Sequence, residues 1–155
     1  METLSKIIVN RAYTKWDLIN GLYELKNHLE TDLKLRLIII DSLPTILLNS
    51  NDHVKNNLYL NHLVNIMRYI SVQHHVAFLI TNLITTWNDG DFKNQQNLVE
   101  SIACGRYWLS VPNIRLKIQK SEDQNAYTFF VVNSDSLNTK TKNNVNILLT
   151  DQGFL

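Results

Sequence analysis

A short aliphatic run that ends in a carboxylate places the strongest constraint on the fold of this chain. In the stretch LRLIIIDSLPTIL, the four aliphatic residues Leu37–Ile40 are followed directly by Asp41 and Ser42. A continuous aliphatic run of this length is typical of a strand that is buried on both faces of a parallel sheet. Ligands of open α/β sheets bind at the carboxyl ends of such strands. We therefore expect Asp41 to lie at a binding edge.

The elements around this strand alternate in type. We expect a strand within Lys6–Tyr13, a helix after Thr14, the strand that ends at Asp41, a helix from about Asp52 to Gln73 and a strand at Val76–Asn82. Thr14 is placed to cap the first helix, and Asp17 completes a weak capping box. The helices carry apolar stripes, formed by Leu18, Leu22, Leu25 and Leu29 and by Leu60, Leu63, Val64, Met67 and Ile70. This order predicts a mostly parallel α/β sheet flanked by helices, with Ile38, Ile40, Phe78 and Ile80 against them.

The second half of the chain has a different pattern. Leu83–Asn97 contains NDG and NQQN and little apolar periodicity, so we expect a long polar loop. A short helical segment fits Leu98–Ser110. Three strands are expected at Ile114–Lys120, Ala126–Val132 and Val145–Thr150. Because only polar turns separate these strands, we expect them to add antiparallel to one edge of the sheet.

Composition limits the class of protein. At 155 residues the chain suits a single domain, residues 1–155, and its net charge of +1 gives no broad electrostatic footprint for nucleic acid. The lone Cys104 excludes an internal disulfide framework and is expected to be buried. Met1–Lys6 has no signal-peptide pattern, and no apolar run approaches the ~20 residues that span a bilayer. A reducing intracellular compartment is the default expectation.

Most catalytic motifs are absent from the sequence. The five His form no metal-binding helix pair, there is no G-x-S-x-G elbow, and four Gly leave no phosphate loop. Asp41 followed by Ser42 has the pattern of a Walker B element, in which the Asp holds Mg²⁺ against nucleotide phosphates. An N-cap for the next segment is the alternative role for Asp41, and this strand by itself does not separate the two.

Three later stretches carry a family resemblance. VAFLITNLIT is similar to the strand that follows Walker B in RecA-type recombinase ATPases, and NVNILLTDQGF is similar to the closing strand, with Gly153 in its turn. ACGRYWLSVPNIRL, with Gly105-Arg106, Trp108, Val111-Pro112 and Arg115, resembles a segment of the D-type paralogues of the eukaryotic recombinase. The resemblance extends from Ile7 to the end of the chain. It implies a RecA-like sheet that lacks its N-terminal strands.

The resemblance also bears on ATP. In the family the phosphate loop, a strand with the catalytic Glu and a small N-terminal domain precede the strand that matches Ile7–Val9, and these 155 residues contain none of them. Leu83 stands where many members have a Gln or His that senses the γ-phosphate. ATP and Mg²⁺ are implied by the family, with Asp41 and Ser42 as the remnant of their site. We expect no ATP hydrolysis by this chain alone, because Mg²⁺ is normally held jointly with the phosphates.

Leu83–Ile102 falls where the family has its second DNA-binding loop. Its formal charge is −2, from Lys93 against Asp89, Asp91 and Glu100. The candidate DNA contacts are Thr85, Trp87, Lys93, Arg106 and Arg115. For Arg106 a phosphate contact and an ion pair remain equally open, whereas Trp108 is expected to pack in the core. Binding to a single strand would be weak and salt-sensitive.

The leading hypothesis is a subunit that acts in homologous-recombination DNA repair in the nucleus, bound to other recombinase paralogues and weakly to single-stranded DNA. An interaction scaffold that has lost both ATP and DNA binding is the alternative. The chain as an incomplete piece of a DNA-dependent ATPase, or an ATPase completed by a neighbouring subunit, also remains open. A sheet without its first strands should expose an apolar edge and face, which a partner would cover.

Overall fold

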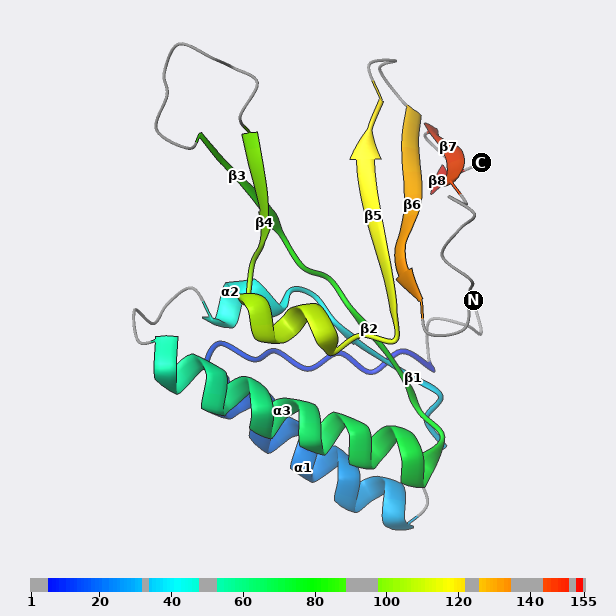
Figure 1. The fold of residues 1–155 in the computed structure, drawn as a ribbon. Coiled ribbons are helices and arrows are strands. Elements are labelled where there is room, and N and C mark those ends of the chain that lie inside the picture. Colours follow the sequence, from blue (N-terminus) through cyan, green and yellow to red (C-terminus); the bar gives the residue numbers. More distant parts are fainter. Residues whose placement is uncertain are drawn as a thin grey trace. The chain divides into compact units, whose positions relative to one another are not determined.

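The computed structural model describes residues 6–31, 34–47, 53–88, 98–121, 126–134, 144–150 and 153–154. The chain divides into two compact units, Met1–Leu109 and Ser110–Leu155. The first unit holds two long helices, a parallel strand pair and a hairpin, and the second holds an antiparallel sheet (Figure 1). The described part is therefore mixed α/β, and each unit is taken in turn below.

Helix α1 (Lys15–Thr31) begins at the predicted capping box. The backbone N–H of Asp17 donates to Thr14 Oγ1 at 3.1 Å, and the carboxylate of Asp17 accepts from the N–H of Thr14 at 2.8 Å. Each residue thus satisfies a backbone donor that the first helical turn would leave unpaired. Leu22 of the predicted stripe is buried, and so is Ile19, which widens the apolar face by one residue.

Helix α3 (His53–His74) runs beside α1 and supplies more buried apolar residues than any other described element (Figure 1). The five residues of its predicted stripe are all at least nine-tenths buried: Leu60, Leu63, Val64, Met67 and Ile70. Tyr23 of α1 and His62 of α3 tie the outer surfaces of the helices, with Tyr23 Oη 3.1 Å from His62 Nε2. The two rings meet edge to face. Both helix predictions are confirmed.

Strands β1 (Leu37–Ile40) and β2 (Ala77–Ile80) form a parallel pair, with Leu37 opposite Ala77 and Ile40 opposite Ile80. Alternation divides their side chains between two faces. Ile40 is 7% exposed, whereas Ile39 is 57% exposed. Leu79, the neighbour of Ile39 in the register, is also exposed. The predicted inward set is thus the more buried one, and the opposite apolar face lies open.

Short helix α2 (Leu43–Leu47) follows β1 at once. Four of its five residues are buried, so it closes the core where the parallel pair ends. Strands β3 (Ile84–Asn88) and β4 (Leu98–Ile102) then pair antiparallel, from Ile84 opposite Ile102 to Asn88 opposite Leu98. The predictions of a loop from Leu83 and of a helical segment from Leu98 are therefore wrong for these strands. The β-branched and aromatic run Ile84–Trp87 suits a strand once it has a partner. The 3₁₀ helix η2 (Arg106–Ser110) matches only the end of the predicted helical segment.

The second unit is an antiparallel sheet in the order β5 (Ile114–Lys120), β6 (Ala126–Ser134), β7 (Asn144–Thr150) and β8 (Gly153–Phe154). The three predicted strands and their antiparallel pairing are confirmed. They form a sheet of their own instead of extending the parallel pair, so the predicted addition to its edge is wrong.

The strand predicted within Lys6–Tyr13 is also wrong. This segment has no strand, and Ile7, Ile8 and Val9 are exposed. A strand needs a neighbour for its N–H and C=O groups, and among the described residues Ile7–Val9 has none. The parallel part of the described structure is thus a two-stranded pair, which shows an α/β unit and is smaller than the RecA-like sheet that the sequence predicts.

Candidate functional site

The carboxyl ends of β1 and β2 bring two polar residues together. Because Ile40 and Ile80 are partners in the parallel register, the residues that follow them, Asp41 and Thr81, emerge side by side. The N–H of Thr81 donates to the carbonyl of Ile40 at 3.1 Å, which continues the ladder by one step. The Thr81 hydroxyl donates to Asp41 Oδ1 at 2.5 Å. Asp41 is exposed, so this carboxylate stands at the predicted binding edge.

Ser42 leads directly into α2. Its hydroxyl lies 2.7 Å from that of Thr45, one turn further on. The carbonyl of Thr81 accepts a hydrogen bond of 3.3 Å from the N–H of Leu43, which fixes the start of α2 against the end of β2. Ser42 is the residue before the helix, and the hydrogen bond of Asp41 runs to the neighbouring strand. This contact differs from the N-cap role considered for Asp41.

Asn82 joins the end of β2 to the base of the hairpin formed by β3 and β4. Its amide Nδ2 donates to the carbonyl of Ala103 at 3.0 Å, and its Oδ1 accepts from the N–H of Leu83 at 2.8 Å. The N–H of Ala103 in turn donates to the carbonyl of Leu83 at 2.9 Å. One side chain thereby closes the hairpin at the point where it leaves the sheet.

The turn after β4 contains two consecutive residues with positive φ, Cys104 at 74° and Gly105 at 73°. This conformation suits Gly and is uncommon for Cys. Cys104 Sγ lies 3.8 Å from Asn82 Oδ1, and burial raises the pKa of the thiol to about 11. Trp108 in η2 is 3% exposed, which confirms its predicted place in the core. The turn is therefore held by Asn82 on one side and by buried Trp108 on the other.

The predicted DNA contacts lie on different elements. Thr85 lies in β3, where its hydroxyl donates to the carbonyl of Ser101 at 3.2 Å, and Arg106 begins η2 with an exposed side chain. Trp87 lies in β3, but its side chain is outside the described part, as is the whole of Lys93. Arg115 is half-buried in β5 and belongs to the second unit.

The roles of Thr81 and Asn82 were missed by reasoning from sequence, although both follow the second aliphatic strand directly. The pairing of the two aliphatic strands was the signal that could have identified these roles. Once β1 and β2 are taken as an in-register parallel pair, the residue after each strand must lie at one edge. Thr81 is then the nearest donor to Asp41, and Asn82 faces the next segment of the chain.

These groups fit a Mg²⁺–nucleotide pair poorly. Asp41 supplies one carboxylate and Ser42 one hydroxyl, and the described residues contain no group of three His, Cys, Asp or Glu that could hold a metal ion. The 155 residues have no G-x-x-x-x-G-K-[ST] loop to cradle phosphates. What the edge offers is a set of oriented hydroxyl and amide groups beside a hairpin.

Comparison with protein-family models and with curated proteins gives no match for this chain. Within the described part of the chain, none of the helices has the length and apolar character needed to cross a membrane.

Proposed function

We propose that this chain is a recombinase-paralogue subunit in homologous-recombination DNA repair, acting in the nucleus. In this role it binds other recombinase paralogues and presents the hairpin formed by β3 and β4 to single-stranded DNA. It does not hydrolyse ATP by itself. The proposal rests first on the sequence resemblance to RecA-type recombinases.

One structural observation carries the proposal furthest. Asp41 and Thr81 end neighbouring parallel strands and are hydrogen-bonded at 2.5 Å, and Asn82 then ties that edge to the base of the hairpin. These contacts join the stretch that resembles Walker B, the Thr-Asn stretch and the base of the hairpin, which supports the proposal. The parallel register that joins them is a property of open α/β sheets.

The chemistry of the hairpin suits a weak contact with a single strand. Stacking requires flat side chains and the phosphates require cations, and the segment offers Trp87 and Lys93, with Arg106 just beyond it. Asp89, Asp91 and Glu100 oppose phosphate in the same segment, so few net contacts are expected. Binding of this kind should be measurable at low salt and should weaken as salt rises.

The exposed apolar face of the parallel pair supports a protein partner. Ile39 is 57% exposed and Leu79 is 50% exposed, on strands whose opposite face packs in the core. A cover for these side chains would remove apolar area from water, at roughly 25 cal/mol per Å². In the proposed assembly another recombinase paralogue provides this cover.

The test is fluorescence anisotropy of a labelled oligothymidine with the full chain at increasing salt. Trp87→Ala combined with Lys93→Ala should remove most of the binding. Lys26→Ala, which removes a cation from α1, should change it little. Two or three phosphate contacts made by the hairpin segment contribute roughly −2 to the slope of a plot of log affinity against log salt. If the parent chain shows no affinity even at low salt, the scaffold function is favoured instead.

A further inference from the structure

A group of basic side chains lies at the amino ends of the two parallel strands, opposite the carboxyl ends that carry Asp41 and Thr81. Lys34 and Arg36 lead into β1, and His74 and His75 lead into β2. The backbone carbonyl of Arg36 accepts a hydrogen bond of 2.9 Å from the N–H of Ala77, so the two lead-in segments are held side by side. We call these four residues the amino-edge cluster.

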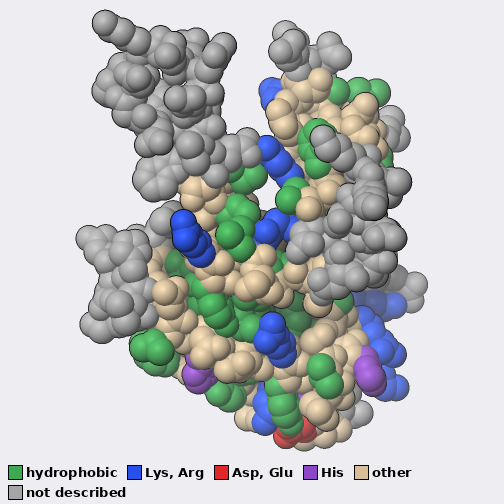
Figure 2. Space-filling model, in the orientation of Figure 1, with side chains coloured by type: hydrophobic (Ala, Val, Ile, Leu, Met, Phe, Trp, Pro, Cys, Tyr) green, Lys and Arg blue, Asp and Glu red, His purple; other side chains and the backbone are tan. Residues whose placement is uncertain are grey.

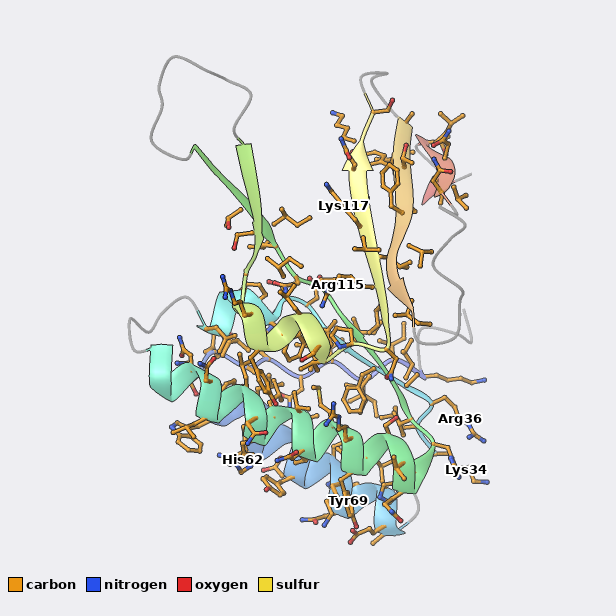
Figure 3. All side chains as sticks on the ribbon, in the orientation of Figure 1. Lys34, Arg36, His62, Tyr69, Arg115 and Lys117 are labelled. Carbon is orange, nitrogen blue, oxygen red and sulfur yellow. The ribbon has the colours of Figure 1, made fainter. Side chains whose placement is uncertain are left out.

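Most of the cluster is open to solvent. Lys34, Arg36 and His75 are exposed, and Figure 3 shows Lys34 and Arg36 projecting from the same corner of the unit. In Figure 2 several Lys and Arg side chains gather beside a His at the right-hand edge of the view, and Asp and Glu show only near the bottom. This part of the surface is therefore rich in cations.

The two permanent cations lack carboxylate partners in the described part of the chain. The ion pair seen there joins Lys26 to Glu30 at 3.2 Å, and Glu30 is the described acidic residue nearest in sequence to Lys34. Asp32 lies outside the described residues. A Lys or Arg without a paired carboxylate is available for an external anion.

The spacing of the cations indicates a chain-like anion. Lys34 and Arg36 are two residues apart in the segment that enters β1, so their side chains lie on one side, about 6.6 Å apart along an extended backbone. Successive phosphates of an extended nucleic acid strand are separated by a similar length. Arg36 suits a phosphate because the guanidinium can donate two parallel hydrogen bonds to its oxygens. His75, held with φ at 54°, brings an imidazole to the same edge.

The carbonyl ends of α1 and α3 oppose an anion at this edge. The effect of a helix terminus fades within its last turn. Lys34 and Arg36 follow the last residue of α1 by three and five positions, on the approach to β1. His74 lies in the last turn of α3.

We infer that the amino-edge cluster is a second binding surface for the phosphate backbone of nucleic acid. It is separate from the hairpin, because β1 has four residues and is about 13 Å long from its amino end to its carboxyl end. The inference rests on the proposed function for its choice of nucleic acid as the ligand. It adds a contact that involves neither the hairpin nor Asp41.

The test uses the full chain and the same labelled oligothymidine. Lys34→Ala combined with Arg36→Ala removes two cations, and Lys26→Ala combined with Arg68→Ala is the control of equal charge on the helices. Loss of two phosphate contacts should make the salt slope shallower by about 1.4. Raising the salt fourfold should then weaken the parent by roughly sevenfold more than the amino-edge variant. The control should keep the parent's slope.

The outcomes separate this inference from the proposed function. If the hairpin variant loses binding and the amino-edge variant keeps the parent's slope, the inference is overturned and the proposed function stands. If the amino-edge variant alone loses affinity, the inference stands and the hairpin is not the DNA site. Competition by polyglutamate as strong as that by oligothymidine would identify an acidic peptide as the ligand and overturn the inference. Absence of binding by the parent chain would also overturn the inference.

Discussion

The hydroxyl of Thr81 donates a hydrogen bond of 2.5 Å to the carboxylate of Asp41, across the carboxyl ends of β1 and β2. The two residues are 40 positions apart in the sequence and meet because the strands pair in parallel register. The contact gives the carboxylate of Asp41 a hydrogen-bond donor from the neighbouring strand end. It also connects the edge to Asn82 and to the hairpin.

This arrangement predicts how the chain behaves with nucleotide. Asp41 is the carboxylate that the described residues place at this edge, and the 155 residues contain no phosphate loop. The purified chain should therefore show no saturable micromolar binding of a fluorescent ATP analogue in the presence of Mg²⁺. Asp41→Ala should leave the titration as flat as that of the parent. Saturable micromolar binding that disappears in the Asp41→Ala variant would contradict this expectation.

The hydrogen bonds of Asn82 at the base of the hairpin predict that removing its side chain lowers stability locally. Asn82→Ala removes the donor to the Ala103 carbonyl and the acceptor for the Leu83 N–H. The free energy of unfolding should fall by about 1–2 kcal/mol, because a half-buried carbonyl loses its partner. Hydrogen exchange of the Ala103 amide, which bonds to Leu83 at the hairpin base, should speed up.

Asn65→Ala on the exposed surface of α3 is the matched control and should leave both measurements near those of the parent. Unchanged exchange at Ala103 in the Asn82→Ala variant would show that the hairpin base is held by other contacts.

The two faces of β1 provide a matched pair of core substitutions. Ile40 is 7% exposed, so Ile40→Ala should lower the free energy of unfolding by roughly 2–5 kcal/mol. The neighbouring Ile39 is on the open face, so Ile39→Ala should cost about 0.5 kcal/mol or less. Urea denaturation measures both. Equal losses for the two variants would mean that the open face is covered in solution.

Much of the first unit could be predicted from the sequence. The helices carry long apolar stripes with the helical period, and the aliphatic runs of β1 and β2 end in polar residues, so local signals and tertiary packing agree. The segment Ile7–Val9 has the same strand-like composition, yet it is exposed and pairs with none of the described strands. Whether such a run becomes a strand depends on a neighbour that its own residues do not specify.

The candidate site was predictable only in part. Asp41 stands out because it ends an aliphatic run, but its contact with Thr81 depends on the register between two distant strands. The polar Asn, Asp and Gln residues between β3 and β4 led to the prediction of a loop, although the run Ile84–Trp87 forms a strand. The grouping of the final strands in a separate sheet also required pairing information that no single strand carries.

The capping box of α1 gives a pH-dependent prediction. Hydrogen bonds from the backbone N–H groups of Tyr13 and Thr14, and one that involves the Thr14 side chain, hold the pKa of Asp17 below its usual value of about 3.9. The stability from this carboxylate is complete above that value and is lost as pH falls through the lower pKa of the folded state. Asp17→Asn should therefore be less stable than the parent at pH 6, and the gap should be smaller at pH 2.

Urea denaturation of both proteins at the two pH values measures this gap, and an NMR titration of the Asp17 carboxyl reports the pKa directly. A gap of the same size at both pH values would mean that the charge of Asp17 does not stabilise the cap.

The central claim is that the hairpin after Asn82 contacts single-stranded DNA without the help of ATP. The most direct measurement is photo-crosslinking of a bromodeoxyuridine-substituted oligonucleotide to the full chain, without nucleotide and at low salt, followed by mass spectrometric mapping. The account predicts crosslinks within Leu83–Arg106, and their loss in the variant that combines Trp87→Ala with Lys93→Ala. Crosslinks that map outside both this segment and the amino-edge cluster, or that persist unchanged in that variant, would contradict it.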